Sequence, residues 1–275
     1  MGEGSGLERF KAFEAEGWGQ RAGTYEDVLG SITARVAEPL LDAAGVRAGM
    51  RVLDVATGPG YAAERAATRG AHPVGIDIAE GMLALARARQ PELDFRWGDA
   101  EQLPFEDGSF DAVVGGFVVN HLPDPERAME EAVRVLSPGG SVAFSVWDRP
   151  ERNRLNGVFA DAVEDVGADR SPEVAEGPDP YRFADDAAFE ALLTGAGIDD
   201  VAVETLSLTL TVPDADALWD GFMGSSVRMR AEIDAQTEDV RRRIREAFEH
   251  RVDVHRRPGG LELPAVAKLA SGRTG

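Results

Sequence analysis

The sequence predicts an α/β fold with a doubly wound, mostly parallel sheet. Residues 52–55 form an apolar strand that runs into a glycine-bearing turn and then a helix. A second apolar segment, residues 75–78, carries an acid at Asp77. Apolar segments and helical patterns then alternate up to Trp147, which is typical of parallel strands joined by crossover helices. A sheet of this kind binds its ligand where the carboxyl ends of neighbouring strands meet.

The elements of the first half of the chain follow from local patterns. A glycine-rich start predicts a frayed end over residues 1–8, and two helices are expected next, at residues 7–15 and 25–44. Apolar runs bounded by turn residues predict five strands, at residues 51–56, 73–77, 93–97, 110–115 and 141–146. Helices follow the first two strands, at residues 61–69 and 81–89. Another begins after Asp124, a favoured N-cap residue, with Pro125 at the first helical position.

After Trp147 the regular alternation ends. Helical patterns are expected at residues 155–166, 185–194, 214–223 and 232–252. The last of these has Val240, Ile244 and Phe248 at four-residue spacing on one face. Two further strands are expected, at residues 200–210 and 263–270.

The turn after the first strand allows more than one interpretation. Gly58, Gly60 and Ala63 also satisfy the short dinucleotide fingerprint. However, Pro59 removes one N–H from a turn that would hold a pyrophosphate, and 29 basic against 49 acidic residues give a net charge of −20. A cofactor with no phosphate and a cationic centre, S-adenosylmethionine (SAM), fits this background better. A strand–turn–helix without ligand remains the plain structural alternative.

Composition excludes several classes of function. The chain has no cysteine, and therefore no disulfide, cysteine nucleophile or thiolate metal site. No run of 18 apolar residues is present to span a membrane, and the N-terminus lacks a secretory pattern, so a cytoplasmic location is expected. Strong acidity argues against a nucleic-acid substrate. No group of His, Asp and Glu has metal-ligand spacing, so no metal is predicted.

Four segments resemble the motifs of class I SAM-dependent methyltransferases. Within this class the segments resemble the branch that acts on small molecules and has a methyltransferase domain of type 11. That branch includes enzymes of ubiquinone and menaquinone biosynthesis. The segments are in family order, at residues 52–60, 75–78, 98–105 and 136–140. One departure is Ala56, which stands where the family motif usually opens with glycine. The resemblance implies a Rossmann-like methyltransferase fold with a seven-stranded sheet, whose final two strands pair antiparallel. It also implies SAM as the cofactor and S-adenosylhomocysteine as its product.

The resemblance further implies that helical segments cover the core as a cap. The expected parts are an N-terminal helical lid at 1–45, a SAM-binding core at 46–150, a cap insertion at 151–183, a core continuation at 184–212, a helical cap insertion at 213–258, and a final strand and tail at 259–275.

The turn and the two acids supply the first candidate cofactor residues. Gly58 and Gly60 allow the turn to approach the cofactor closely, because a Cβ at either would occupy ligand space. Asp77 is expected to accept hydrogen bonds from the ribose hydroxyls, with a strand-end cap as the alternative. The resemblance places Asp99 on the adenine amino group with the N–H of Ala100 nearby, and a structural turn is the alternative for Asp99.

Further candidates surround this turn. Thr57 belongs to it, and Ile78 and Met82 are expected to flank the adenine, although core packing explains them equally well. The resemblance implies that Phe117 offers a backbone carbonyl to the methionine amine. It also implies that Tyr25 covers the cofactor as part of the lid. Trp18 is a second candidate for that cover, and plain packing is the alternative for both aromatic residues.

His121 is the candidate catalytic residue. Of the four histidines, it alone follows directly on the fourth predicted strand, at the carboxyl edge where the transferred methyl group should project. A histidine there could take a proton from the acceptor. The alternative is that His121 packs under the cofactor or caps the following loop. Asp54, at the base of the turn, is expected to organise the turn rather than to act in the chemistry.

The predicted activity is methyl transfer from SAM to an O, N or C atom of a small, hydrophobic acceptor, such as a secondary metabolite or a quinone-like molecule. Five cap residues are suited to line a hydrophobic acceptor pocket, with cap core as the alternative: Phe159, Trp219, Phe222, Met223 and Met229. The other hypotheses are a SAM-binding fold that catalyses cyclisation or isomerisation, a nicotinamide-dependent oxidoreductase, and a binding protein or regulator. The sequence does not determine the oligomeric state and leaves a homodimer open.

Overall fold

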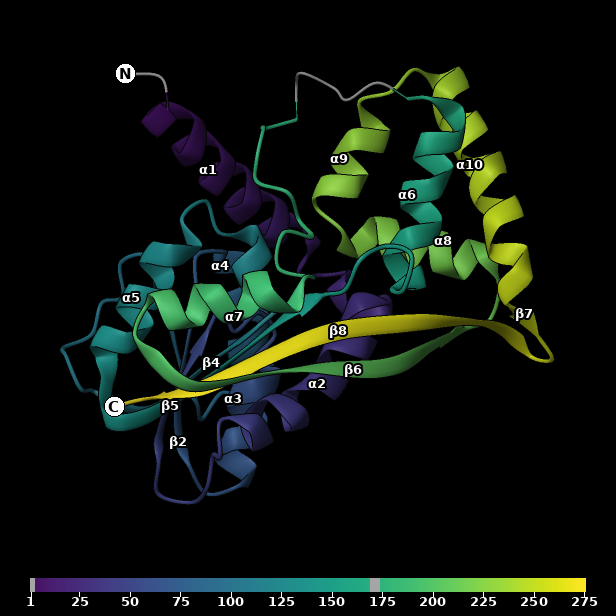
Figure 1. The fold of residues 1–275 in the computed structure, drawn as a ribbon. Coiled ribbons are helices and arrows are strands. Elements are labelled where there is room, and N and C mark those ends of the chain that lie inside the picture. The colour runs from purple at the N-terminus through teal and green to yellow at the C-terminus, as the bar shows by residue number, and fades with distance from the viewer. Residues whose placement is uncertain (1–2, 169–173) are drawn as a thin grey trace.

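The computed structural model describes residues 3–168 and 174–275. Its centre is a sheet of seven strands in the order β3-β2-β1-β4-β5-β8-β6, with the two-residue β7 paired to β8 (Figure 1). Neighbouring strands from β3 to β5 are parallel, whereas β8 is antiparallel to both β5 and β6. The prediction of a mostly parallel, doubly wound sheet is confirmed.

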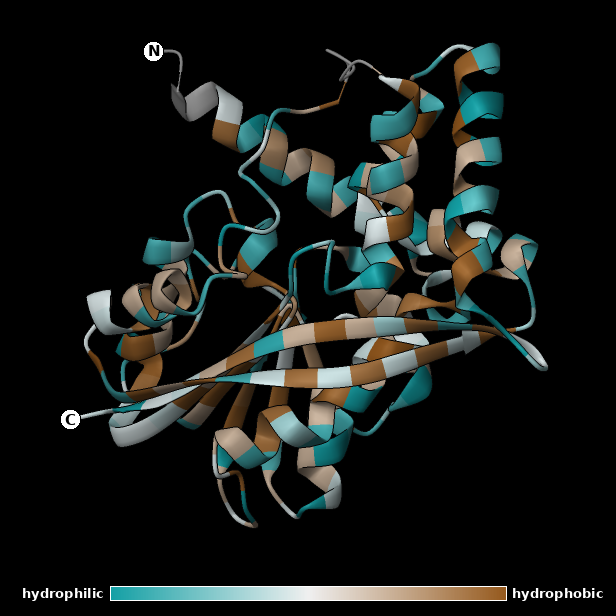
Figure 2. Cartoon of the chain, turned by 45° about the vertical axis from the view of Figure 1, so that its right-hand side comes forward, coloured by the Kyte–Doolittle hydropathy of each residue, from teal (hydrophilic) through white to brown (hydrophobic). Residues whose placement is uncertain are grey.

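The strands extend beyond the expected apolar runs mainly in the C-terminal half. Their bounds are β1 Arg51–Val55, β2 His72–Asp77, β3 Asp94–Trp97, β4 Phe110–Gly116, β5 Leu136–Trp147, β6 Ile198–Val212, β7 Arg256–Arg257 and β8 Gly260–Thr274. β6 and β8 pair along almost their whole length, from Ile198 with Thr274 to Val212 with Leu261. Hydrophobic and polar residues alternate along this long hairpin (Figure 2), as expected for strands with two different faces.

The helices cover both faces of the sheet and form a separate group at one end. Their bounds are α1 Glu3–Arg21, α2 Leu29–Ala43, α3 Tyr61–Thr68, α4 Glu80–Arg89, α5 Pro125–Val135, α6 Arg154–Val166, α7 Asp186–Gly195, α8 Ala215–Ser225, α9 Arg228–Asp234 and α10 Glu238–Val252. α5 and α7 pack on one face of the sheet, and α2 and α3 on the other. α6, α8, α9 and α10 stand together above the outer part of the β6–β8 hairpin (Figure 1).

The group of helices α6, α8, α9 and α10, called the cap from here on, has its own aromatic core. The Phe159 ring stacks on Phe222, with ring centroids 4.0 Å apart, and lies 4.7 Å from the Phe248 ring. Leu261 and Leu263 of β8 are fully buried in the same cluster, so the end of the hairpin forms the floor of the cap. Burial of three phenylalanine side chains stabilises this arrangement by about 1.5–3 kcal/mol each.

Three expected helices differ from those observed. The helix expected at residues 25–44 is a short 3₁₀ helix, Tyr25–Asp27, followed by α2 from Leu29. The first helix was expected at residues 7–15 after a frayed start, but α1 begins at Glu3 and continues to Arg21. Its length follows from docking, because Phe10 is buried and Gly19 lies against the backbone of Gly81 in α4. The helix expected at 232–252 is two helices, since the hydroxyl of Thr237 accepts from the Val240 N–H and starts α10 anew.

Candidate active site

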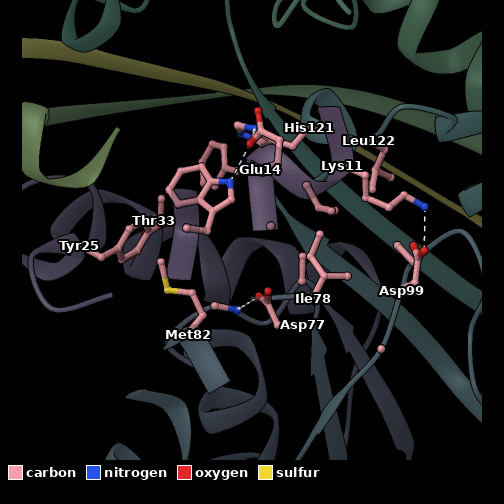
Figure 3. A pocket seen from close by; sticks show the side chains of 18 of the residues that line it. Lys11, Glu14, Tyr25, Thr33, Asp77, Ile78, Met82, Asp99, His121 and Leu122 are labelled. Atoms are coloured by element: carbon pink, nitrogen blue, oxygen red, sulfur yellow. Dashed lines mark hydrogen bonds and ion pairs between the residues drawn. The ribbon is translucent and has the colours of Figure 1, made fainter. Parts of the chain in front are cut away.

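A cavity of about 920 Å³, part of it open to solvent, lies at the carboxyl ends of β1, β2, β3 and β4 (Figure 3). α1 and α2 contribute the wall opposite the strand ends. Eight predicted cofactor residues line this cavity: Tyr25, Gly58, Asp77, Ile78, Met82, Asp99, Ala100 and Phe117. His121 and Trp18 line it as well. The sequence therefore identified residues that the fold brings to one place, which is the edge where parallel-sheet proteins bind ligands.

Asp77 is a buried acid at the strand ends that border this cavity. Its Oδ2 accepts from the Gly58 N–H at 2.9 Å (Figure 3), and its Oδ1 accepts from the Ala79 N–H at 2.8 Å. These bonds hold the carboxylate between the turn and the start of α4. Because a carboxylate has about four acceptor positions, these bonds do not use all of them. The pair of ribose hydroxyls in SAM fits such a group.

Asp54 organises the turn, as expected. Its Oδ2 accepts from the Thr57 hydroxyl at 2.6 Å and from the Ala63 N–H at 3.0 Å. One buried carboxylate thereby ties β1, the turn and α3 together, and burial raises its pKa to about 7. Thr57 lines a smaller adjoining cavity of about 420 Å³ and does not line the larger one.

Ala56 has a left-handed backbone conformation, with φ of +52°. This explains why glycine usually stands at that motif position, because a Cβ in this region costs about 1–2 kcal/mol. The strained residue lies at the cavity wall. Phe117, at the end of β4, is likewise left-handed with φ of +58°, and its ring stacks on Trp147 at 4.0 Å. Ala56 and Phe117 are thus two non-glycine residues with a left-handed backbone, each directly after a strand of the sheet, and both line the cavity.

The two glycines of the turn have different roles. A Cβ at Gly58 would meet no atom within 4 Å, which leaves the open approach that a bound adenosyl group needs. A Cβ at Gly60 would lie 2.8 Å from Cζ of Phe95, and Gly60 lines neither of the two cavities described above. The expectation that a side chain at Gly60 would enter ligand space is therefore corrected. Gly60 permits the close packing of the turn on β3.

Replacing Gly60 with alanine is expected to destabilise the protein by about 2–3 kcal/mol. The substitution adds a clash with Phe95 to the cost of a positive φ of +85°. Gly139→Ala is the matched control, because Gly139 has a positive φ of +73° but no neighbour within 4 Å of its Cβ. Urea unfolding of both variants measures the difference, and equal losses would contradict the packing explanation.

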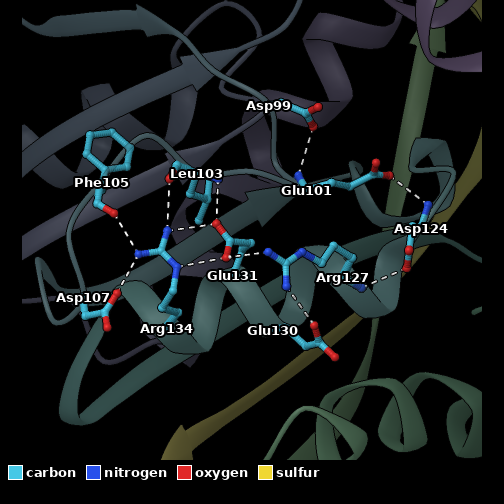
Figure 4. Close-up of polar contacts among 10 residues, drawn as sticks. All are labelled: Asp99, Glu101, Leu103, Phe105, Asp107, Asp124, Arg127, Glu130, Glu131 and Arg134. Carbon is cyan, nitrogen blue, oxygen red and sulfur yellow. Dashed lines mark hydrogen bonds and ion pairs between the residues drawn. The ribbon is translucent and has the colours of Figure 1, made fainter. Parts of the chain in front are cut away.

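The loop after β3 holds Asp99 and Ala100 in place. Arg134 of α5 donates to the carbonyl oxygens of Leu103 at 3.0 Å and Phe105 at 2.8 Å. Glu131 accepts from the Leu103 N–H at 2.8 Å, and its hydrogen bond to Arg134 lowers its pKa (Figure 4). Because α5 satisfies backbone groups of this loop, the loop is fastened beside the cavity without regular secondary structure.

Asp99 has two protein partners. Its Oδ2 accepts from Nζ of Lys11 at 2.7 Å, and its Oδ1 accepts from the Glu101 N–H at 2.9 Å. Lys11 also pairs with the Glu101 carboxylate. Asp99 therefore has the structural role in the turn that was the alternative from the sequence, and it also lines the cavity. Lys11, one of the two lysines in the chain, fastens α1 to this loop.

Among the cavity residues that the sequence did not indicate are two charged ones, Lys11 and Glu14. Together with Trp18 they recur at three- and four-residue spacing and share one face of α1. That spacing was visible, but two charged residues on a helix usually indicate a solvent-exposed face. Instead, Glu14 is buried and accepts from Nε1 of Trp18 at 2.9 Å.

The five apolar cap residues expected at an acceptor pocket do not line the main cavity. Phe159, Phe222 and Met223 are buried in the cap core, and Trp219 and Met229 pack against it. They stabilise the cap by stacking on one another, so the structural alternative is the correct one. Apolar side chains that do line the main cavity include those of Leu122, Pro123 and Trp147.

Within residues 3–168 and 174–275, no group of three or more His, Cys, Asp or Glu side chains could hold a metal ion. None of the helices in the same ranges is both long and apolar enough to cross a membrane.

Cofactor affinity is expected to depend on pH through Asp77. Burial raises the pKa of this carboxyl to about 6, and only the ionised form accepts from both ribose hydroxyls. Binding should therefore be strongest above pH 6 and weaken, by up to about tenfold per pH unit, as the pH falls below it. The free energy of unfolding without ligand depends on pH in the opposite direction. The raised pKa of Asp77 stabilises the fold at low pH, and that contribution is lost as the pH rises through 6. Calorimetric titration with S-adenosylhomocysteine measures the dependence, and Asp77→Asn should abolish it. If the affinity of that variant depended equally steeply on pH, the titrating group would be Asp54, whose pKa burial also raises.

Comparison with known proteins agrees with this geometry. Residues 53–144 match the family described as Methyltransferase domain. The chain is 31% identical over 183 residues to a demethylmenaquinone methyltransferase of Paenarthrobacter aurescens, covering 64% of this chain and 72% of that protein. It is 38% identical over 129 residues to one from Renibacterium salmoninarum, covering 47% of this chain and 54% of that protein. The chain thus spans about half the length of one relative and about seven tenths of the other.

The fold is also that of solved structures. A Bacillus halodurans protein superposes with a TM-score of 0.56 and 23% identity, covering 86% of this chain and 97% of the other. The glycine turn, the buried acid at the end of β2 and the shared sequence over the core lead to one assignment. The chain belongs to the class I SAM-dependent methyltransferases.

Proposed function

We propose that the protein transfers the methyl group of SAM to a small, planar, quinone-like acceptor in its reduced, hydroquinone form. The observation that carries this proposal is that one cavity is lined by Asp77 and Asp99 and also by His121 and the aromatic side chains of Trp18 and Trp147. Two relatives are named as demethylmenaquinone methyltransferases. The reduced form is required by the chemistry, because methyl transfer needs an electron-rich acceptor.

In this proposal the carboxyl ends of the strands bind the cofactor. Asp77 accepts from the ribose, Asp99 and Ala100 lie at the adenine, and Ile78 and Met82 provide its apolar sides. Phe117 offers its backbone carbonyl to the methionine amine, near the turn of Thr57 and Gly58. The methionine end extends toward the smaller cavity, which Tyr25, Gly58 and Phe117 also line.

The N-terminal segment, residues 1–45, serves as the lid. α1 supports this role because it contributes Lys11, Glu14 and Trp18 to the cavity wall. Tyr25 completes the cover, since its hydroxyl donates to Thr33 at 3.1 Å and its ring lies 6.0 Å from Trp18. Covering the cavity excludes water and holds the acceptor in line with the reacting bond.

SAM, when bound, supplies an electrophilic methyl group. The protein supplies orientation and a place for the proton: aromatic walls hold the acceptor flat, and His121 takes the proton from the acceptor hydroxyl. Removal of that proton raises the electron density of the ring and its oxygen.

The test is turnover of a named probe. Purified protein is incubated under nitrogen with SAM and 1,4-dihydroxynaphthalene, and S-adenosylhomocysteine and methylated product are measured by mass spectrometry. Equimolar formation of both supports the proposal. Methylation of other acceptor classes but not of this probe would overturn the quinone assignment. SAM binding with no S-adenosylhomocysteine from any acceptor of a metabolite panel would indicate a cyclisation or isomerisation instead.

A further inference from the structure

Glu14 of α1 connects three parts of the molecule at the His121 end of the cavity. Its side chain is only 3% exposed. Oε2 accepts from Nε1 of Trp18 at 2.9 Å and lies 3.0 Å from Nδ1 of His121; Figure 3 shows Glu14 beside His121. Oε1 accepts from Nε of Arg228 at 2.6 Å. One buried carboxylate is thus shared by the N-terminal helix, the core segment after β4 and the cap helix α9.

The charge of Glu14 determines which nitrogen of His121 carries the proton. Burial opposes ionisation of Glu14, but its interactions with His121 and Arg228 outweigh burial and lower its pKa to about 2. An ionised carboxylate only accepts hydrogen bonds, so Nδ1 of His121 must be the donor. In the neutral imidazole, Nε2 is then the nitrogen with a free lone pair.

The surroundings also fix the orientation of the His121 ring. Trp18 meets the imidazole edge-on, with ring centroids 5.3 Å apart and an interplanar angle of 85°. Arg228 holds the other oxygen of Glu14 and is itself anchored, because it donates to the carbonyl oxygens of Pro178 at 3.0 Å and Asn120 at 3.1 Å. The carboxylate is therefore held from the cap side, and its Oε2 remains directed at Trp18 and His121.

We propose that Glu14 is a positioning residue that fixes the tautomer and the ring of His121, so that the N-terminal helix completes the catalytic base. The inference rests on the proposed function of His121. In the step it serves, the O–H bond of the acceptor breaks, its electron pair stays on oxygen, and the proton forms the N–H bond at Nε2. Glu14 stabilises the resulting imidazolium. Methyl transfer then forms a bond between the acceptor and the methyl carbon and breaks the methyl–sulfur bond, whose electron pair stays on sulfur in S-adenosylhomocysteine. If the new bond is to oxygen, the methyl group takes the place of the hydroxyl proton; if it is to a ring carbon, that carbon loses its own proton and the oxygen is protonated again. His121 releases its proton to solvent.

The activity test compares Glu14→Gln with two variants. Glu14→Gln keeps the size of the side chain but removes the charge, and Glu16→Gln is the matched control, because Glu16 is exposed on the same helix. With 1,4-dihydroxynaphthalene at about neutral pH, Glu14→Gln should lower kcat at least about tenfold while the Kd of S-adenosylhomocysteine changes less than about twofold. The loss should shrink as the pH rises into the range where the hydroxyls of the probe ionise unaided. His121→Ala should show the same pH pattern, and Glu16→Gln should match the unaltered protein.

A second measurement does not depend on turnover or on any substitution of Glu14. The chain has four histidines, and nitrogen-15 NMR of the complex with S-adenosylhomocysteine distinguishes their tautomers, with His121→Asn giving the assignment. His121 in its neutral form should carry its proton on Nδ1. Protonation on Nε2 instead would overturn the proposal outright.

The outcomes separate this inference from the function on which it rests. If His121→Ala keeps full activity on a probe that the unaltered protein methylates, His121 is not the base, and Glu14 cannot act by positioning it. If His121→Ala loses activity but Glu14→Gln stays within about twofold, only the role of Glu14 is overturned. An equal loss for Glu14→Gln at every pH would show that Glu14 merely fastens the helix.

Discussion

Replacing His121 with alanine is expected to lower kcat about a hundredfold or more on a hydroquinone probe. The imidazole is the basic side chain at the acceptor end of the cavity, and its removal leaves proton transfer to water. Cofactor binding should change little, since the carboxylates that would hold adenosine lie at the other end. Steady-state kinetics together with calorimetric titration of S-adenosylhomocysteine measure the two effects separately.

His250→Ala is the control for this substitution, because His250 is exposed on α10 and does not line the cavity. It should leave kcat unchanged. If His121→Ala instead weakens cofactor binding while turnover stays normal, His121 packs against the cofactor, as the alternative drawn from the sequence has it. The edge-on contact with Trp18 would then be its main role.

Replacing Asp77 with alanine is expected to weaken cofactor binding by about 1.5–3 kcal/mol, which corresponds to about 10–150-fold in Kd. The variant loses the acceptor of the ribose hydroxyls. It also frees the N–H groups of Gly58 and Ala79, so the turn is less well held. Calorimetric titration with S-adenosylhomocysteine gives the affinity, and thermal unfolding shows whether the fold itself has changed.

Asp94→Ala is the matched control for Asp77, because Asp94 is an exposed acid on the neighbouring strand β3 whose partner is Arg96. It should leave the affinity unaltered. An unchanged affinity in Asp77→Ala would show that the carboxylate only joins the turn to α4. A reduced affinity accompanied by a large drop in stability would be resolved with Asp77→Asn, which keeps one side-chain acceptor for the backbone.

Local patterns were sufficient to predict the core of the fold. The apolar run before Gly58, the acid after β2, and the cap formed by Asp124 and Pro125 each depend on neighbours within a few residues. Asp124 accepts from the Arg127 N–H at 2.9 Å, as its position predicted. The candidate cofactor residues followed in turn, because the carboxyl ends of adjacent parallel strands must meet at one edge.

Long-range packing could not be predicted in the same way. The break between α9 and α10, and the burial of the five apolar cap residues among themselves, depend on which helices meet. The requirement for glycine at position 60 comes from Phe95, which lies 35 positions away in the chain and only in the folded sheet approaches the turn. Neither partner of that contact carries a local signal.

The sequence by itself determined the strand–turn–helix core, the acid at the end of β2 and the family, because these depend on short periodicities and fixed spacings. Only the tertiary structure decided what surrounds His121. Glu14 and His121 are 107 positions apart, and Glu14 and Arg228 are 214 apart. Such contacts arise when separately formed elements dock, and a charged residue on a helix looks the same in the sequence whether it ends in water or against a histidine.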